Sequence, residues 1–101
     1  FEFSPAFQTE GFRAYREAKS NRKFDKLIAA IEKLNVAIEN DDTLGKGFRI
    51  GHSYFCTERK IDDMWLNAVI TYEIIPLLNE YWFDEPSKVR DWKYVLREAI
   101  R

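Results

Sequence analysis

The chain has 101 residues, of which 46% are hydrophobic, 16% aromatic and 33% charged. This composition is typical of a folded domain, because a disordered chain lacks the apolar side chains that offset chain entropy, and the length suits one domain with one core. Sixteen Lys and Arg against seventeen Asp and Glu give a net charge of -1, which argues against a free-standing nucleic-acid binder, since such proteins usually carry a basic excess.

The first residues alternate as in a β-strand. Phe1-Glu2-Phe3 has the alternation and Ser4-Pro5 ends it. The end of a single strand is not stable alone, so we predict that the chain is part of a larger protein; a processed or frayed terminus is the alternative. We divide the single domain, 1–101, into a strand end and linker at 1–5 and a helical part at 6–101.

Two helices are predicted next. Thr9 can cap a short helix over residues 10–19, and Ser20 or Asn21 can cap a longer one over residues 22–40. Apolar residues recur at spacings of three and four along the longer helix, at Phe24, Leu27, Ile28, Ile31, Leu34 and Ile38. This stripe predicts the face that turns toward the core.

The second half of the chain also reads as helical. Thr57 or Asp62 can open a third helix, in which the pattern turns Met64, Trp65, Ala68 and Val69 inward. Pro76 predicts a kink or a break near Thr71, because proline removes a helical hydrogen bond. A last helix begins at 84–86, with inward positions at Val89, Trp92, Val95 and Leu96. The fold class is therefore all-α, a small bundle of four to five helices.

A glycine-rich connection, residues 44–56, contains three of the four glycines and the only histidine and cysteine. Its glycines, Gly45, Gly47 and Gly51, match neither the dinucleotide fingerprint nor the phosphate loop. A nucleophile elbow would need glycine where Phe55 stands. His52 and Cys56 give two of the three or four ligands that zinc requires. We predict no catalytic residue and no metal site here, and the lone cysteine excludes an internal disulfide and suits a reducing cytoplasm.

Three side chains in this connection suit an anion. If a short helix begins after Gly51, its free N–H groups with His52 and Ser53 would face a phosphate, and Arg49 would add positive charge. In the alternative, Arg49 is solvated, His52 makes a local capping bond, and neighbouring apolar residues pack inward. Those residues are Phe48, Ile50, Tyr54 and Phe55.

Basic residues gather over the first two helices. They are Arg13, Arg16, Lys19, Arg22, Lys23 and Lys26. The plain interpretation is a solvated helix face, because acidic residues elsewhere balance the charge. The functional interpretation is a surface laid against DNA or a protein partner.

Several segments resemble a known family. The runs are LGKGFRIGHSYF at 44–55, WLN at 65–67, PLLNEY at 76–81 and FD at 83–84. They resemble the C-terminal part of the McrB-type AAA+ GTPase subunit of 5-methylcytosine-specific restriction systems. The resemblance implies a helical lid that closes over nucleotide, with residues 1–5 as the last strand leaving the AAA+ core. It also implies sensor-2-like, nucleotide-proximal roles for Arg49, Gly51, His52 and Ser53.

The same resemblance gives the remaining loop residues a structural role. These are Gly45, Gly47, Phe48, Tyr54 and Phe55. For the parent protein it implies GTP and Mg²⁺ as cofactors. The implied partners are the AAA+ core of the same chain, neighbouring subunits of a hexamer, a McrC-type endonuclease subunit, and DNA through the whole complex, with no membrane and in the cytoplasm.

The fragment lacks the phosphate loop and the magnesium-binding motif, so we expect that alone it neither hydrolyses GTP nor cleaves DNA. The alternative function is a self-contained helical module that binds protein or DNA without nucleotide. Its contact residues would be Arg13, Arg16, Lys19 and Lys23.

Overall fold

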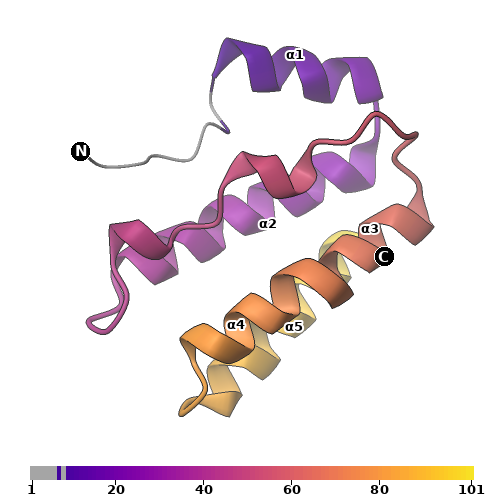
Figure 1. Ribbon diagram of the computed structural model, residues 1–101. Helices are drawn as coiled ribbons and strands as arrows, with labels where there is room; N and C mark the ends of the chain where they lie inside the picture. Colours follow the sequence, from indigo (N-terminus) through magenta and orange to yellow (C-terminus); the bar gives the residue numbers. More distant parts are fainter. Residues whose placement is uncertain (1–6, 8) are drawn as a thin grey trace.

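The computed structural model describes residue 7 and residues 9–101, which form helices joined by short connections (Figure 1). In chain order these are α1 (Glu10–Lys19), α2 (Arg22–Glu39), the 3₁₀ turns η1 (Lys46–Phe48) and η2 (His52–Phe55), α3 (Asp63–Val69), the π segment η3 (Ile70–Ile74), α4 (Ile75–Tyr81) and α5 (Pro86–Ala99). No strand occurs in this part of the chain, and the predicted all-α class is confirmed. The strand end predicted at residues 1–5 lies outside the described residues. None of the described helices is both long and apolar enough to span a lipid bilayer.

Three helices begin at side chains that local sequence predicts as caps. Thr9, Asn21 and Asp62 each accept a hydrogen bond from the backbone N–H three residues further along, at 3.2, 2.9 and 2.8 Å. Each bond satisfies an amide that the start of a helix leaves without an intrahelical partner. The bounds of α1 agree with the prediction, and α2 ends at Glu39, one residue before the predicted end.

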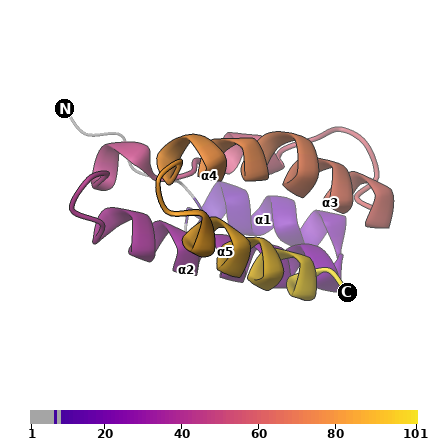
Figure 2. The same cartoon turned by 90° about the horizontal axis from the view of Figure 1, so that it is seen from below.

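The long helix α2 occupies the middle of the fold. It lies between α1 on one side and the helices α3 to α5 on the other (Figure 1). Figure 2 views the molecule from the side of α4 and α5, which run next to each other. Contacts join α2 to α5 and to η1, and α4 to α5. α2 therefore contacts both the glycine-rich connection and the last helix of the chain.

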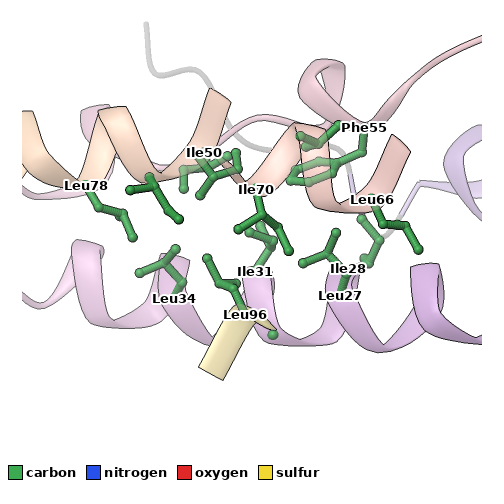
Figure 3. Close-up of a cluster of buried hydrophobic side chains, with 14 of the residues drawn as sticks. Leu27, Ile28, Ile31, Leu34, Ile50, Phe55, Leu66, Ile70, Leu78 and Leu96 are labelled. Carbon is green, nitrogen blue, oxygen red and sulfur yellow. The ribbon is translucent and has the colours of Figure 1, made fainter. Parts of the chain in front are cut away.

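The core is one cluster of buried side chains centred on the predicted stripe of α2. Leu27, Ile28, Ile31 and Leu34 of α2 are fully buried and face residues of the second half of the chain (Figure 3). Those facing residues include Leu66, Ile70, Leu78 and Leu96. Burial of this apolar surface, at roughly 25 cal/mol per Å², is the main stabilising term of such a bundle.

Two residues predicted to face inward are exposed. Met64 has 81% of its surface accessible and Val95 has 39%, whereas Leu66 and Leu96 are fully buried. Successive residues of a helix point about 100° apart, so a shift of one or two positions turns a side chain away from the core. The interpretation was wrong at these positions because the apolar pattern there is broad enough to fit two faces.

Pro76 produces no break near Thr71. Five residues before the α4 boundary, Ile70–Ile74, form a π segment, and Pro76 lies in the first turn of α4. Proline offers no N–H and its ring crowds the carbonyl four residues back, so a wider turn before it absorbs both defects. The helix continues through Thr71, so the predicted break was wrong. The change to π geometry at Ile70–Ile74 includes Thr71, where the alternative prediction placed a kink.

Asp41, just after α2, ties this helix to the turn between α4 and α5. Its carboxylate accepts hydrogen bonds from the Thr43 hydroxyl at 2.6 Å, the Trp82 indole N–H at 2.8 Å and the Lys88 ammonium at 3.1 Å. The Trp82 ring is itself buried. These bonds, led by the Thr43 hydroxyl, hold the pKa of Asp41 well below its usual range.

We expect this carboxylate to make stability depend on acid pH. Because the folded-state pKa of Asp41 is depressed below 3.8, its stabilising contribution is complete above that value and is lost as the pH falls toward the folded pKa. Asp41→Asn should therefore be less stable than the unmodified chain at pH 7, with the difference shrinking below about pH 4. Urea denaturation between pH 7 and pH 2.5 measures this. A difference that is constant with pH would contradict the assignment.

Candidate functional site

The glycine-rich connection folds as the two 3₁₀ turns η1 and η2. Gly45 begins η1 with φ at 94°, a backbone angle that favours glycine, and its N–H donates to the Ile38 carbonyl at 3.1 Å. Gly45 is the one glycine with positive φ in the described part of the chain. Gly51, which precedes η2, is buried instead. A positive φ therefore explains the glycine at position 45 but not Gly47 or Gly51.

A buried amide side chain fixes the connection between the two turns. Asn35 of α2 is 6% exposed. Its Nδ2 donates to the Ile50 carbonyl at 2.9 Å, and its Oδ1 accepts from the Ile50 N–H at 2.6 Å. Both polar groups of the Ile50 backbone are thereby satisfied inside the core. We call this pair of bonds the Asn35 clamp.

Apolar side chains hold both ends of the candidate segment. Ile50 precedes Gly51, and Phe55 ends η2; both are buried in the core (Figure 3). In a 3₁₀ turn residues three apart lie on the same side. Thus Phe55 and His52 face the interior side of η2, and Tyr54 lies away from it with 36% of its surface exposed.

The Tyr15 hydroxyl of α1 fixes the backbone after η2. It accepts a hydrogen bond from the Thr57 N–H at 2.8 Å and lies 3.0 Å from the Phe55 carbonyl, to which it can donate. Burial raises the pKa of Tyr15, so the hydroxyl stays protonated and available as a donor. α1 and the end of η2 are joined in this way although they are 42 residues apart.

Further contacts join residues 19–23 to residues 59–63. The Lys19 ammonium donates to the Arg59 carbonyl at 2.8 Å, and the Asn21 amide donates to the Ile61 carbonyl at 2.8 Å. Lys23 then pairs with Asp63 at 3.1 Å. The start of α2 and the segment before α3 therefore lie side by side. Two of the basic residues considered for DNA binding are engaged in these contacts, and a third, Arg16, lies 3.8 Å from Asp25.

The predicted site residues are held by different elements. Arg49 is half-buried, and its Nε donates to the Lys46 carbonyl of η1 at 3.0 Å. His52 is also half-buried, with its ring edge-on to Phe12 of α1 at 6.0 Å between centroids. Ser53 is exposed. Arg49 is thus tied to η1, and the ring of His52 to α1.

One nitrogen of His52 is unusual. Its Nδ1 is buried and has no hydrogen-bond partner in the described part of the chain. A buried polar atom without a partner is costly, commonly about 1–3 kcal/mol, and calls for an explanation. The local capping bond considered for this residue is not formed by Nδ1.

The expected inward packing of the loop aromatics holds for one of three. Phe55 is buried, but Phe48 is 42% exposed, although its ring meets the Tyr81 ring edge-on at 5.4 Å. Tyr54 also faces outward, as the geometry of η2 requires. Phe48 therefore anchors η1 against α4 at the surface rather than in the core.

Sequence reasoning missed the two residues that hold the connection most directly. Asn35 had a visible signal, because it interrupts the apolar stripe of α2 between Leu34 and Ile38. A polar residue at a core position needs a partner, and here the partner is a loop backbone. Tyr15 had no such signal, because a half-buried tyrosine on a short helix is ordinary.

The described residues therefore define a small all-α domain in which one central helix and its neighbour α1 hold a glycine-rich connection between them. The family described as McrB, alpha-helical lid domain, matches residues 26–90, which include α5 only as far as its first turn. The chain belongs to this family, as its resemblance indicated.

A curated relative agrees with this assignment. The chain is 41% identical over 98 residues to the type IV methyl-directed restriction enzyme EcoKMcrB subunit of Escherichia coli strain K12. The match covers 90% of this chain and 21% of that protein. The chain thus spans about a fifth of the length of the relative.

Proposed function

We propose that this chain is the lid of a GTP-hydrolysing AAA+ motor subunit in a restriction system for DNA carrying 5-methylcytosine. The observation that carries the proposal is the family match over residues 26–90, which contains the whole glycine-rich connection. The lid closes over bound nucleotide and transmits the nucleotide state to neighbouring subunits. Alone, it has no enzymatic activity.

In this proposal the segment with Arg49, Gly51, His52 and Ser53 is proximal to the nucleotide. Two contacts support this proposal. The Asn35 clamp holds the backbone at Ile50, and the Tyr15 hydroxyl holds the backbone at Thr57, after these residues. Preorganised groups bind a ligand with less loss of entropy than mobile ones.

GTP and Mg²⁺ would be held mainly by the AAA+ core of the same polypeptide. The connection at 44–56 has no phosphate-loop pattern, and no three His, Cys, Asp or Glu side chains among the described residues are grouped to bind a metal ion. The residues present therefore fit a supplementary contact to nucleotide rather than its main site. The further partners would be adjacent subunits of a hexamer, a McrC-type endonuclease subunit, and DNA bound by the complex.

The test is to replace Arg49 and His52 with alanine, singly and together, in the intact motor. We expect weaker binding of a fluorescent GTP analogue, slower GTP hydrolysis and less nucleotide-dependent assembly, because charge and donors facing the phosphates are removed. Affinity by fluorescence titration, hydrolysis by phosphate release and assembly by light scattering give three separate readings.

Matched controls are the neighbouring exposed residues Arg59 and Tyr54, whose alanine variants should leave all three readings unchanged. Thermal unfolding of each variant separates a change in the site from a loss of fold. Full nucleotide affinity, hydrolysis and assembly in the double variant would rule out this assignment of the connection.

The alternative, a self-contained DNA-binding module, loses support from the contacts of its basic residues. Arg16, Lys19 and Lys23 each approach an acceptor within this chain. Cations already paired release fewer counterions from DNA phosphates and so contribute less to affinity.

A further inference from the structure

The helices α3 and α4, joined by the π segment η3, form one continuous rod. Figure 1 shows this rod in front of α5, with no other element drawn over it. One row of its residues, spaced four apart, is accessible from outside. Met64 and Tyr72 in this row have 81% and 75% of their surface accessible. Pro76 and Glu80 are also exposed, and Ala68 is half-buried. We call these five residues the outer row.

The buried residues of the rod show that the outer row faces away from the core. Four fully buried residues are also spaced four apart: Leu66, Ile70, Ile74 and Leu78. Each residue of the outer row is two positions from one of them, and two positions turn a side chain by about 200° around a helix. The outer row therefore lies on the side of the rod opposite to the core.

The π segment keeps both rows straight. In an α-helix, residues four apart differ by about 40° around the axis, so a row with this spacing drifts sideways. The hydrogen bonds of a π turn span one residue more, so Ile70–Ile74 takes up more residues in a turn and reverses part of the drift. Tyr72 lies in the middle of this segment. Met64, Tyr72 and Pro76 can therefore contact one partner together.

Unpaired acidic residues accompany the outer row. Residues 61–87 contain six acidic residues and no Lys, Arg or His: Asp62, Asp63, Glu73, Glu80, Asp84 and Glu85. Of these, Glu73, Glu80 and Asp84 are exposed and form no ion pair with another described residue. The hollow beside Glu73 and the hollow beside Glu80 have no basic residue in their lining, and basic residues of α5 line a separate hollow with Asn79. The outer row thus combines exposed apolar side chains with free negative charge.

We propose that the outer row binds a basic amphipathic helix of another protein. Side chains four apart form a ridge, and a ridge of this kind packs into the groove of a second helix. Apolar side chains of the partner cover Met64, Tyr72 and Pro76. Its Lys and Arg side chains pair with Glu73 and Glu80. The row from residue 64 to residue 80 spans about 24 Å, the length of roughly 16 helical residues.

The charge and the exposed apolar side chains favour this occupant over others. Nucleic acid and anionic lipid are repelled by the unpaired carboxylates. A second copy of the chain offers no matching helix among those described, because α1 exposes no large apolar side chain and α2 exposes only Val36. In α5, Tyr94 lies on the same side as the acidic residues Asp91 and Glu98. The outer row shares no residue with the proposed nucleotide-proximal segment, so the inference does not depend on the proposed function.

The first experiment titrates the isotope-labelled chain with a synthetic helical peptide and follows the amide signals by nuclear magnetic resonance. The peptide has roughly 16 residues, with leucine along one face and lysine elsewhere. A second peptide carries glutamate in place of every lysine. We expect the lysine peptide to bind more weakly as salt is added and to shift the signals of residues 63–81, and the glutamate peptide not to bind, because the carboxylates of the rod repel it.

The second experiment removes the apolar and acidic parts of the outer row separately. Tyr72→Ser and Met64→Ser should each raise the dissociation constant of the lysine peptide, and the two together should raise it more than about tenfold. Glu73→Gln with Glu80→Gln should raise it more than about threefold and make binding less dependent on salt, because two charge pairs are lost.

Matched controls alter exposed residues elsewhere. Tyr94→Ser on α5, and Glu58→Gln combined with Asp91→Asn, should leave the dissociation constant unchanged. Thermal unfolding shows whether each variant is folded. Equal binding of the two peptides, no binding of either, or equal weakening by the control variants would overturn the proposal. Self-association of the chain, or binding of a DNA duplex, that is abolished by Tyr72→Ser would also overturn it, because the outer row would then have a different occupant.

Discussion

Replacing Phe55 with alanine is expected to lower the free energy of unfolding by about 3–5 kcal/mol, because the change removes a fully buried aromatic ring and leaves a cavity. The Phe55 ring lies in the core beside the Phe7 ring, 5.9 Å away between centroids. It is also the last residue of η2. The substitution should therefore destabilise the domain and release one end of the proposed nucleotide-facing segment. Urea denaturation followed by circular dichroism gives the free energy.

The adjacent residue supplies a matched control. Tyr54 is an aromatic of similar size but is 36% exposed and points away from the core. Tyr54→Ala should cost less than about 1 kcal/mol, as surface substitutions commonly do. Equal losses for Phe55→Ala and Tyr54→Ala would mean that η2 is not oriented as the structure has it.

Asn35→Leu is expected to cost about 2–4 kcal/mol, although it puts an apolar residue at a core position. The variant loses both bonds of the Asn35 clamp and leaves the N–H and carbonyl of Ile50 buried without partners. An unsatisfied buried polar group costs about 1–3 kcal/mol, more than the added apolar contact returns. The Asn35 side chain therefore stabilises the fold by satisfying the buried N–H and carbonyl of Ile50, and not by burying apolar surface.

Hydrogen exchange distinguishes this effect from a general loss of stability. The Ile50 amide should exchange much faster in Asn35→Leu, beyond the change seen at core amides of α2, because its acceptor is gone. Asn67→Leu, at an exposed position of α3, is the control and should change stability by less than about 0.5 kcal/mol. An Asn35→Leu variant as stable as the unmodified chain would show that the clamp is dispensable.

The two anchors give a physical account of how the domain presents its connection. Ile50 is held by α2, and the backbone after Phe55 is held by α1, so the residues between them have fixed ends. In the proposed lid, a displacement of α1 would be passed to His52 through the Phe12 ring contact and through Tyr15. The connection is then a positioned element rather than a flexible loop.

Helix starts and the main apolar stripe were predictable because their causes lie within a few residues of chain. A cap at Thr9, Asn21 or Asp62 needs only an acceptor side chain and an amide three residues on. The stripe of α2 needs only the helical period. Where two faces of a helix are both partly apolar, as around Met64 and Val95, the same reasoning failed.

For the candidate site, the sequence alone was enough to identify Arg49, His52 and Ser53. They lie in one contiguous run whose family resemblance is visible without coordinates. Their anchors were not, because Asn35 is 15 residues from Ile50 and Tyr15 is 42 residues from Thr57. Such contacts depend on how the helices pack. They form because buried backbone N–H and carbonyl groups need partners, and no local sequence pattern shows which distant side chain will supply one. The local chemistry of the chain thus sets its helices and its glycine-rich connection, whereas packing around α2 sets which side chains hold that connection and which way it faces.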